Sequence, residues 1–208
     1  MSRENILHRV RTALGRSAGQ AVADPPPVRI RLPEVAMEDR IASLMLRVEV
    51  LAGVAFRTLD PCGFVGSQIA GKTAVASNAP YLAECGITSL PEVRSGIRQL
   101  DELREICASA DFGITSADYA LADTGTLVML ASPKEARLVS LLPPAHIAVV
   151  PGDRILSGLD ELFSILPRPA EQTSSMVLIT GPSRTADIEQ ILVRGVHGPG
   201  QIAVVVVG

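Results

Sequence analysis

Short apolar runs alternate with stretches of helical spacing along most of this chain. Short, mostly apolar runs predict strands at residues 54–59, 126–130, 146–151, 176–180 and 202–207. Apolar residues three and four positions apart predict helices at residues 2–14, 37–52, 101–110, 116–123, 132–142 and 185–195. This order is typical of βαβ units and predicts an α/β fold of three layers, with a mostly parallel sheet covered on both faces.

The segment between residues 60 and 100 has a weaker pattern. Residues 72–78 predict a short strand, and residues 80–87 predict a turn or a short helix. Residues 111–115 read as extended chain. The sequence therefore places more regular structure in the second half of the chain than in the first.

Capping signals accompany several of the expected helices. Ser2 precedes the first helix and Gly15 follows it, and Gly53 follows the second. Thr115 or Ser116 is available as the cap of the helix expected at 116–123. Ser132, Pro133 and Glu135 match a capping box with proline at the first helical position.

The N-terminal helix is separated from the rest by a small, polar and proline-rich segment, residues 17–29, which reads as a linker. We therefore expect an appendage at residues 1–31 and a compact α/β domain at 32–208. An isolated helix of this length is marginal in water. It must dock either on its own domain or on a second subunit, and the sequence leaves both open.

Composition excludes several classes of protein. The 208 residues are 47% hydrophobic and 20% charged, with a net charge of -3, which gives no basic footprint for nucleic acid. No apolar run reaches the roughly 20 residues of a membrane span, and the N-terminus lacks a secretory pattern, so we expect a cytoplasmic protein. The three cysteines (Cys62, Cys85 and Cys107) form no C-x-x-C pair, which disfavours a disulfide framework or a metal site on this chain.

The closing stretch GPSRTADIEQ holds the first group of candidate binding residues. If a strand ends and a helix begins here, Gly181 allows close backbone approach and Ser183 or Thr185 caps the helix. Free amides and the Arg184 guanidinium would then favour an anion, whereas Asp187 in the first turn favours a small carboxylate over a phosphate. The competing interpretation is that these residues are ordinary caps and surface groups.

The segment GVHGPG that follows contains His197. A histidine in a loop is most often only a polar surface residue, but here it lies near a sheet edge and is a candidate acid–base or ligand-holding group.

A third group is ADTGT, residues 122–126. The Asp-Thr-Gly triplet occurs in aspartic proteases, but those place it in an all-β loop and use two copies, whereas this chain has one copy beside a strand. The simpler interpretation is a turn at Gly125, with Asp123, Thr124 and Thr126 presenting oxygen groups at the sheet edge.

GSQIAGKT, residues 66–73, matches the spelling of a phosphate-binding P-loop. That loop needs an apolar strand before it and a full helix after it. Here Pro61 and Gly63 interrupt the preceding segment, and Pro80 leaves little room for a helix. The match therefore favours a nucleotide hydrolase using Lys72 and Thr73 only weakly. A dinucleotide cofactor is not indicated, because no G-x-G-x-x-G fingerprint follows a strand.

Three motifs in order, ITSADYALADTGTLVML, SLLPPAHIAVVP and ITGPSRTADIEQILVRGVHGPG, resemble the LUD-domain family, in particular its lactate-utilisation protein C type. The resemblance is dense over residues 112–207 and weaker over 32–111, and the opening helix is similar as well. One departure is Asp123, where the family more usually has glutamate, and the carboxylate is retained.

This resemblance implies a fold like that of the NagB, RpiA and CoA-transferase group. It implies a subunit that supports oxidation of L-lactate to pyruvate beside iron–sulfur partner subunits, which would carry the clusters, with no cofactor on this chain. The site would comprise His197 and Asp123 as catalytic groups, with binding residues Thr124, Gly125, Thr126, Gly181, Ser183, Arg184 and Thr185. Arg184 would pair a substrate carboxylate and His197 would take the hydroxyl proton.

Other functions remain open at this point. The chain could be a stand-alone enzyme or binder for a phosphosugar or acyl-CoA, a P-loop nucleotide hydrolase, or a non-catalytic scaffold for the iron–sulfur subunit. The sequence does not distinguish a monomer from a homo-oligomer.

Overall fold

The computed structural model describes residues 2–21, 34–186 and 192–208. The chain divides into two compact units, residues 1–30 and 31–208. The first contains helix α1 (Arg3–Ala13), whose N-terminus is capped by the Ser2 hydroxyl accepting from the Asn5 amide at 3.3 Å. The docking partner of this helix stays as predicted from the sequence, its own domain or a second subunit.

The second unit is built on a six-stranded sheet in which every neighbouring pair is parallel. In spatial order its strands are β1 (Val54–Thr58), β12 (Gln201–Val207), β7 (Ala145–Pro151), β4 (Phe112–Ser116), β2 (Ala74–Ala76) and β3 (Val93–Arg94). β7 and β12 are adjacent and central, which explains their continuous apolar runs, since parallel strands are buried on both faces. The expected α/β fold with a mostly parallel central sheet is confirmed.

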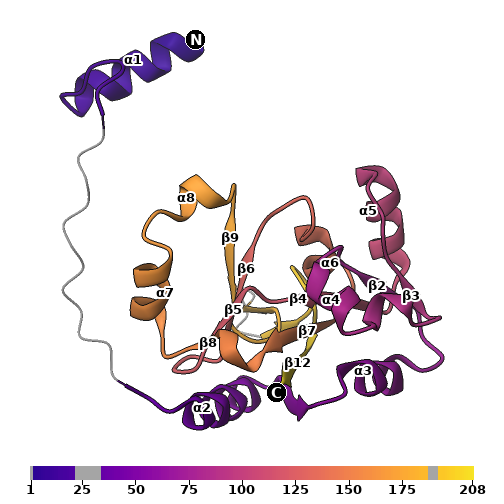
Figure 1. Ribbon diagram of the computed structural model, residues 1–208. Helices are drawn as coiled ribbons and strands as arrows, with labels where there is room; N and C mark the ends of the chain where they lie inside the picture. Colours follow the sequence, from indigo (N-terminus) through magenta and orange to yellow (C-terminus); the bar gives the residue numbers. More distant parts are fainter. Residues whose placement is uncertain (1, 22–33, 187–191) are drawn as a thin grey trace. The chain divides into compact units, whose positions relative to one another are not determined.

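One face of this sheet is covered by short helices that follow β1 and β2 in the chain (Figure 1). They are α3 (Pro61–Ile69), α4 (Pro80–Glu84) and the 3-10 turn η1 (Ile87–Ser89). Val65, Ile69 and Leu82 from these elements pack with Ile147 and Val205 of the central strands in one apolar cluster.

The opposite face is covered by three helices and a second sheet. The helices are α2 (Met37–Val50), α5 (Leu100–Ser109) and α6 (Arg137–Leu141). The second sheet has the order β8 (Ile155–Leu156), β5 (Tyr119–Leu121), β6 (Thr126–Leu130) and β9 (Met176–Ile179). Leu44 and Val48 of α2 join Leu127 and Val204 in a core that ties the two sheets together.

The remaining elements are short. α7 (Leu159–Ile165) contributes Leu162 to an apolar cluster with the second sheet. The 3-10 turn η2 (Gly152–Arg154) links β7 to β8, and α8 (Pro169–Gln172) precedes β9.

Two predicted helices are strands instead. Residues 119–121 form β5, because the Asp118 amide donates to the Val128 carbonyl and the following residues pair with β6 and β8. The described parts of 185–195 form a hairpin of β10 (Arg184–Ala186) and β11 (Leu192–Arg194). Two backbone hydrogen bonds stabilise the base of this hairpin. The Gly195 amide donates to the Ser183 carbonyl, and the Ser183 amide donates to the Pro199 carbonyl.

Two expected helix boundaries are also wrong. The helix predicted at 132–142 is reduced to α6, and residues 132–135 form a turn in which the Ser132 and Glu135 backbones bond to each other. The helix predicted at 37–52 ends at Val50, and Ala52, with φ 63°, is the residue in the left-handed conformation. The Gly53 amide donates to the Val48 carbonyl. Gly53 is required there for space, because a Cβ would lie 2.9 Å from Val48 Cγ1.

Candidate functional site

The residues expected to form one site fall into two groups. The first, Asp123–Thr126, is the tight turn from β5 to β6. Gly125 has φ +70°, and a Cβ on it would lie 2.8 Å from Arg47 Cβ and 3.0 Å from the Val48 amide nitrogen. The glycine is therefore needed because this turn packs directly on α2.

A chain of hydroxyl groups runs along this turn. The Thr124 hydroxyl donates to Asp123 Oδ1 at 3.1 Å, and the Thr126 hydroxyl donates to Thr124 Oγ1 at 2.9 Å. Thr126 Oγ1 also lies 2.9 Å from Thr180 Oγ1, just beyond β9. These hydroxyls bond to one another and fasten the turn to β9, while the Asp123 side chain remains exposed.

The second group lines a hollow that we call the C-terminal hollow, with a volume of ≈ 290 Å³. Gly181, Ser183, Arg184 and His197 all line it, together with Arg137. The His197 amide donates to the Ser183 hydroxyl at 3.4 Å, and the Arg184 guanidinium donates to the Leu51 carbonyl. Thr180 also lines the hollow and connects it to the first group through Thr126.

The hairpin changes the basis of the expected anion site. Ser183 and Thr185 cap no helix, because β10 begins at Arg184. The expected role of Asp187 lies outside the described residues, as does the side chain of Thr185. Anion preference in this hollow therefore depends on Arg184 and Arg137 and not on a helix dipole.

A further group of polar residues, not anticipated from the sequence, lies where the central parallel strands end. Ser77 directly follows β2, and its hydroxyl donates to Glu135 Oε2 at 2.7 Å. Glu135 is 7% exposed, and its Oε1 is buried without a hydrogen-bond partner in the described part of the chain. Ligands of open α/β sheets bind at this carboxyl edge.

Burial raises the pKa of Glu135 to about 8, with the Ser77 hydrogen bond lowering it in part and the charge of Asp118 raising it further. Burial also raises the pKa of Asp118, although the bond from the Leu130 amide and the charge of Arg154 oppose this. At neutral pH Glu135 is therefore a neutral carboxylic acid. Such a group can donate a hydrogen bond to a ligand oxygen, and perturbed carboxyl groups in pockets are typical of functional sites.

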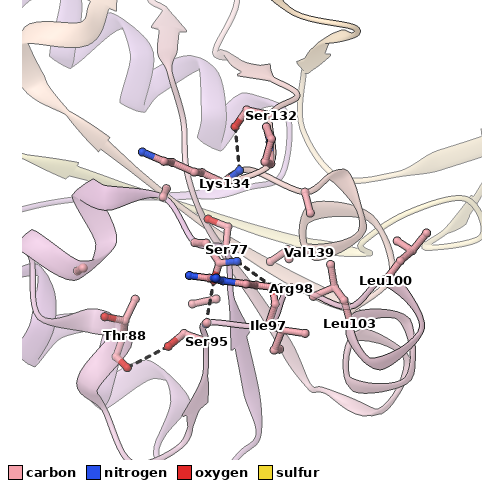
Figure 2. Close-up of a pocket in the computed structure, with 17 residues that line it drawn as sticks. Ser77, Thr88, Ser95, Ile97, Arg98, Leu100, Leu103, Ser132, Lys134 and Val139 are labelled. Atoms are coloured by element: carbon pink, nitrogen blue, oxygen red, sulfur yellow. Dashed lines mark hydrogen bonds between the residues drawn. The ribbon is translucent and has the colours of Figure 1, made fainter.

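Two pockets flank this carboxyl group. The larger, which we call the strand-end pocket, has a volume of ≈ 730 Å³ and is lined by Ser77, Asn78 and residues from the 95–100 and 132–139 segments. Figure 2 shows the side chains of Lys134 and Arg98 extending in the same direction along it. The smaller, the Asp118 pocket, has a volume of ≈ 370 Å³ and contains Glu135; both pockets include Lys134.

The side chain of Asn78 shapes the larger pocket. Its amide nitrogen donates to the Ile97 carbonyl at 2.8 Å, and its oxygen accepts from the Gly96 amide at 2.8 Å. These two bonds fix the loop that carries Arg98. A polar Ser-Asn pair directly after a short apolar strand was the sequence signal that could have located this site.

The P-loop interpretation does not agree with the structure. A P-loop requires the order strand, loop, helix. Here Gly66 lies inside α3, and the loop that contains Lys72 leads into β2, so the order is reversed. The Thr73 amide and hydroxyl both donate to Asp111 Oδ2, at 2.9 and 3.0 Å, and are thus used to position the start of β4.

The buried histidine of the central sheet is His146 on β7. Its Nε2 lies 2.8 Å from the Thr115 hydroxyl, and its Nδ1 has no partner among the described residues. Burial lowers the pKa of His146 to about 4, so the ring is neutral at neutral pH.

The structure is an α/β fold with pockets at the carboxyl edge of its parallel sheet. A sequence profile of the LUD domain matches residues 39–207, and the chain belongs to this family. This confirms the family resemblance noted from the three sequence motifs.

Individual relatives extend the similarity to nearly the whole chain. Lactate utilization protein C 1 of Bacillus mycoides is 30% identical over 99% of this chain and 97% of its own length. Lactate utilization protein C of Bacillus subtilis is 29% identical over 99% of this chain and 96% of its own. The crystal structure of a DUF162 family protein from Deinococcus radiodurans has a TM-score of 0.66 and 19% identity, covering 84% of this chain and all of that one. This last likeness concerns the fold alone.

Two further observations apply to the described ranges. None of their helices is long and apolar enough to cross a membrane. None of their His, Cys, Asp and Glu side chains forms a group of three or more suited to a metal ion.

Proposed function

We propose that this chain is a cytoplasmic subunit in the utilisation of L-lactate, supporting its oxidation to pyruvate together with iron–sulfur partner subunits. The observation that carries the proposal is the extent of the similarity, which includes 96–97% of two relatives named lactate utilization protein C. The similarity therefore covers nearly the whole length of these relatives and does not rest on one shared motif.

In this proposal the C-terminal hollow holds the lactate carboxylate. Arg184 and Arg137 both line it and supply guanidinium groups, which match carboxylate geometry. His197 lines the same hollow and is the proposed acceptor of the hydroxyl proton. Oxidation of lactate to pyruvate releases two electrons and two protons. The hydroxyl proton would pass to His197, the Cα proton to a base of the assembly, and the electrons, one at a time, to the iron–sulfur clusters of the partners.

The experiment is complementation of a strain that lacks the gene, with growth on L-lactate as the readout. Arg184→Ala is expected to abolish or strongly slow this growth. The matched control is Arg194→Ala, because Arg194 pairs with Arg184 in the hairpin, is exposed and does not line the hollow. Circular dichroism of both purified variants checks that they are folded.

Equal growth of both variants would remove Arg184 from the site. Normal growth of the deletion strain on L-lactate would overturn the function itself. Co-purification of the wild-type chain with Fe–S subunits, read from the visible absorbance of the clusters, tests the proposed partners separately.

A further inference from the structure

The strand-end pocket has the size and lining of a site for a ligand larger than lactate. Its ≈ 730 Å³ falls within the range of about 300–1,000 Å³ that is typical of small-molecule pockets. A three-carbon hydroxy acid would leave most of this volume empty. The site is also distinct from the C-terminal hollow, since no lining residue is shared between the two.

The wall of the pocket is aliphatic on one side. Ile97, Leu100, Leu103 and Val139 line it, and Leu100 is 67% exposed although its neighbours in the lining are largely covered. No aromatic side chain is among the lining residues, so a nucleotide base would find no stacking partner. This wall suits a ligand with a flexible hydrocarbon chain.

The opposite side carries positive charge. Neither the Lys134 ammonium nor the Arg98 guanidinium has an ion-pair or hydrogen-bond partner within residues 2–21, 34–186 and 192–208. The carboxyl groups that line the adjoining Asp118 pocket together with Lys134 are those of Glu84, Asp118 and Glu135, and Glu135 is the residue next to Lys134. Because the Glu135 carboxyl is neutral at neutral pH, it does not cancel the positive charge.

Glu135 lies beside the strand-end pocket, in the lining of the adjoining Asp118 pocket. Its Oε2 accepts from Ser77, which lines the strand-end pocket, while the buried Oε1 is unpartnered. A buried polar atom without a partner is destabilising. A ligand oxygen in the Asp118 pocket that accepts a hydrogen bond from the protonated Glu135 carboxyl would supply that partner.

We propose that the strand-end pocket binds an aliphatic carboxylate longer than lactate. Its carboxylate lies between Lys134 and Arg98, and its hydrocarbon part packs on Ile97, Leu100 and Leu103. This site is separate from the one proposed for lactate, and neither proposal depends on the other.

The chain offers an internal control for the first test, because Lys72 and Lys134 are its only lysines. The full-length protein is treated with an amine-acetylating reagent with and without octanoate, and mass spectrometry follows the two lysines separately. Octanoate at ten times its dissociation constant is expected to slow acetylation of Lys134 about tenfold. Acetylation of Lys72, which lies outside the pocket, is expected to keep its rate.

Two results would overturn the proposal. Equal protection of both lysines, or none, would show that octanoate does not occupy the pocket. Equal protection of Lys134 by L-lactate and octanoate at the same concentration would show that the aliphatic wall makes no contribution to binding.

The second test uses variants at exposed positions that the fold tolerates. Leu100→Ser is expected to weaken octanoate binding by about tenfold in calorimetry, since it removes the exposed end of the aliphatic wall. Leu46→Ser is the control, because Leu46 is 59% exposed on α2 and does not line the pocket. The same loss of affinity in both variants would contradict the assigned position of the hydrocarbon.

Discussion

The Ser77 hydroxyl donates a 2.7 Å hydrogen bond to the Glu135 carboxyl group, joining the end of β2 to a loop 58 positions later in the chain. Both residues are buried, and the second carboxyl oxygen of Glu135 has no partner in the described residues. A carboxylic acid is thereby held at the carboxyl edge of a parallel sheet, where it can contact a ligand. Its protonation also makes the stability of the fold depend on pH.

The first prediction concerns stability between pH 6.5 and 8. In the unfolded chain Glu135 ionises from its ordinary pKa of 4.5, whereas in the folded chain its pKa is raised to about 8. The folded state therefore binds more protons than the unfolded state in this range, although folded Glu135 begins to ionise near pH 8 and unfolded His146 still binds part of a proton near pH 6.5. The free energy of unfolding should fall as the pH rises, by up to about 1 kcal/mol per pH unit and most steeply near pH 7–7.5.

Glu135→Gln keeps an acceptor for Ser77 and removes the titrating group. Urea denaturation at several pH values should show no fall in the free energy of unfolding of this variant between pH 6.5 and 8. An unchanged slope in the variant would show that Glu135 is not the group responsible.

A second prediction combines Glu135 with His146. The pKa of His146 is lowered from 6.5 to about 4 by burial, so the unfolded state takes up a proton below pH 6.5 that the folded state does not. Between pH 4.5 and 6.5 this uptake offsets the proton held by folded Glu135. The wild-type free energy of unfolding should therefore be nearly constant in this window.

His146→Gln removes one of the two opposing effects. Its stability should rise on acidification from pH 8 to 4.5 without the plateau of the wild type, by about 1.4 kcal/mol per pH unit. The same denaturation series measures it. A plateau in the variant would mean that His146 is not protonated on unfolding in this window.

A third prediction compares two glycines with the same backbone angle. Gly125 has φ +70° and a Cβ there would press on Arg47 and Val48, whereas Gly71 has φ +71° and open space around it. Gly71→Ala should cost about 1 kcal/mol for the left-handed backbone, and Gly125→Ala about 1–3 kcal/mol more for the displaced helix. Equal losses in chemical denaturation would refute the close packing of this turn on α2.

A fourth prediction concerns the ion pair between Arg40 and Glu161, which lie 3.0 Å apart with side chains 15% and 17% exposed. Glu161 also accepts bonds from the Ser157 amide and hydroxyl, both at 2.7 Å. A double-mutant cycle with alanine should give a coupling of about 1–2 kcal/mol. The same cycle on Arg57 and Glu38 should give a smaller value, because that pair is exposed to solvent. Equal couplings would show that burial does not strengthen the first pair.

The sequence determined the two central strands of the parallel sheet, whereas the edge strand β3 was not predicted. The apolar runs at 146–151 and 202–207 became β7 and β12, because a strand buried on both faces needs apolar residues throughout. The three ordered motifs determined the family in the same way, since each is a local feature of the chain.

Tertiary contacts decided the elements whose local pattern was ambiguous. Residues 119–121 have a helical pattern but pair with two distant strands, and the hairpin at 184–194 is closed by bonds to Gly195 and Pro199. Spacing within such short segments does not contain the hydrogen bonds that distant partners provide.

The candidate sites also differ in how far the local sequence determines them. Gly181, Ser183, Arg184 and His197 are close in sequence, and local reasoning could group them around one hollow. Ser77 and Glu135 are far apart, and in the sequence Glu135 matched a capping box. The parallel sheet brings their two segments to one edge, which the sequence does not show. Burial at that edge raises the pKa of Glu135, so that its carboxyl group is protonated at neutral pH.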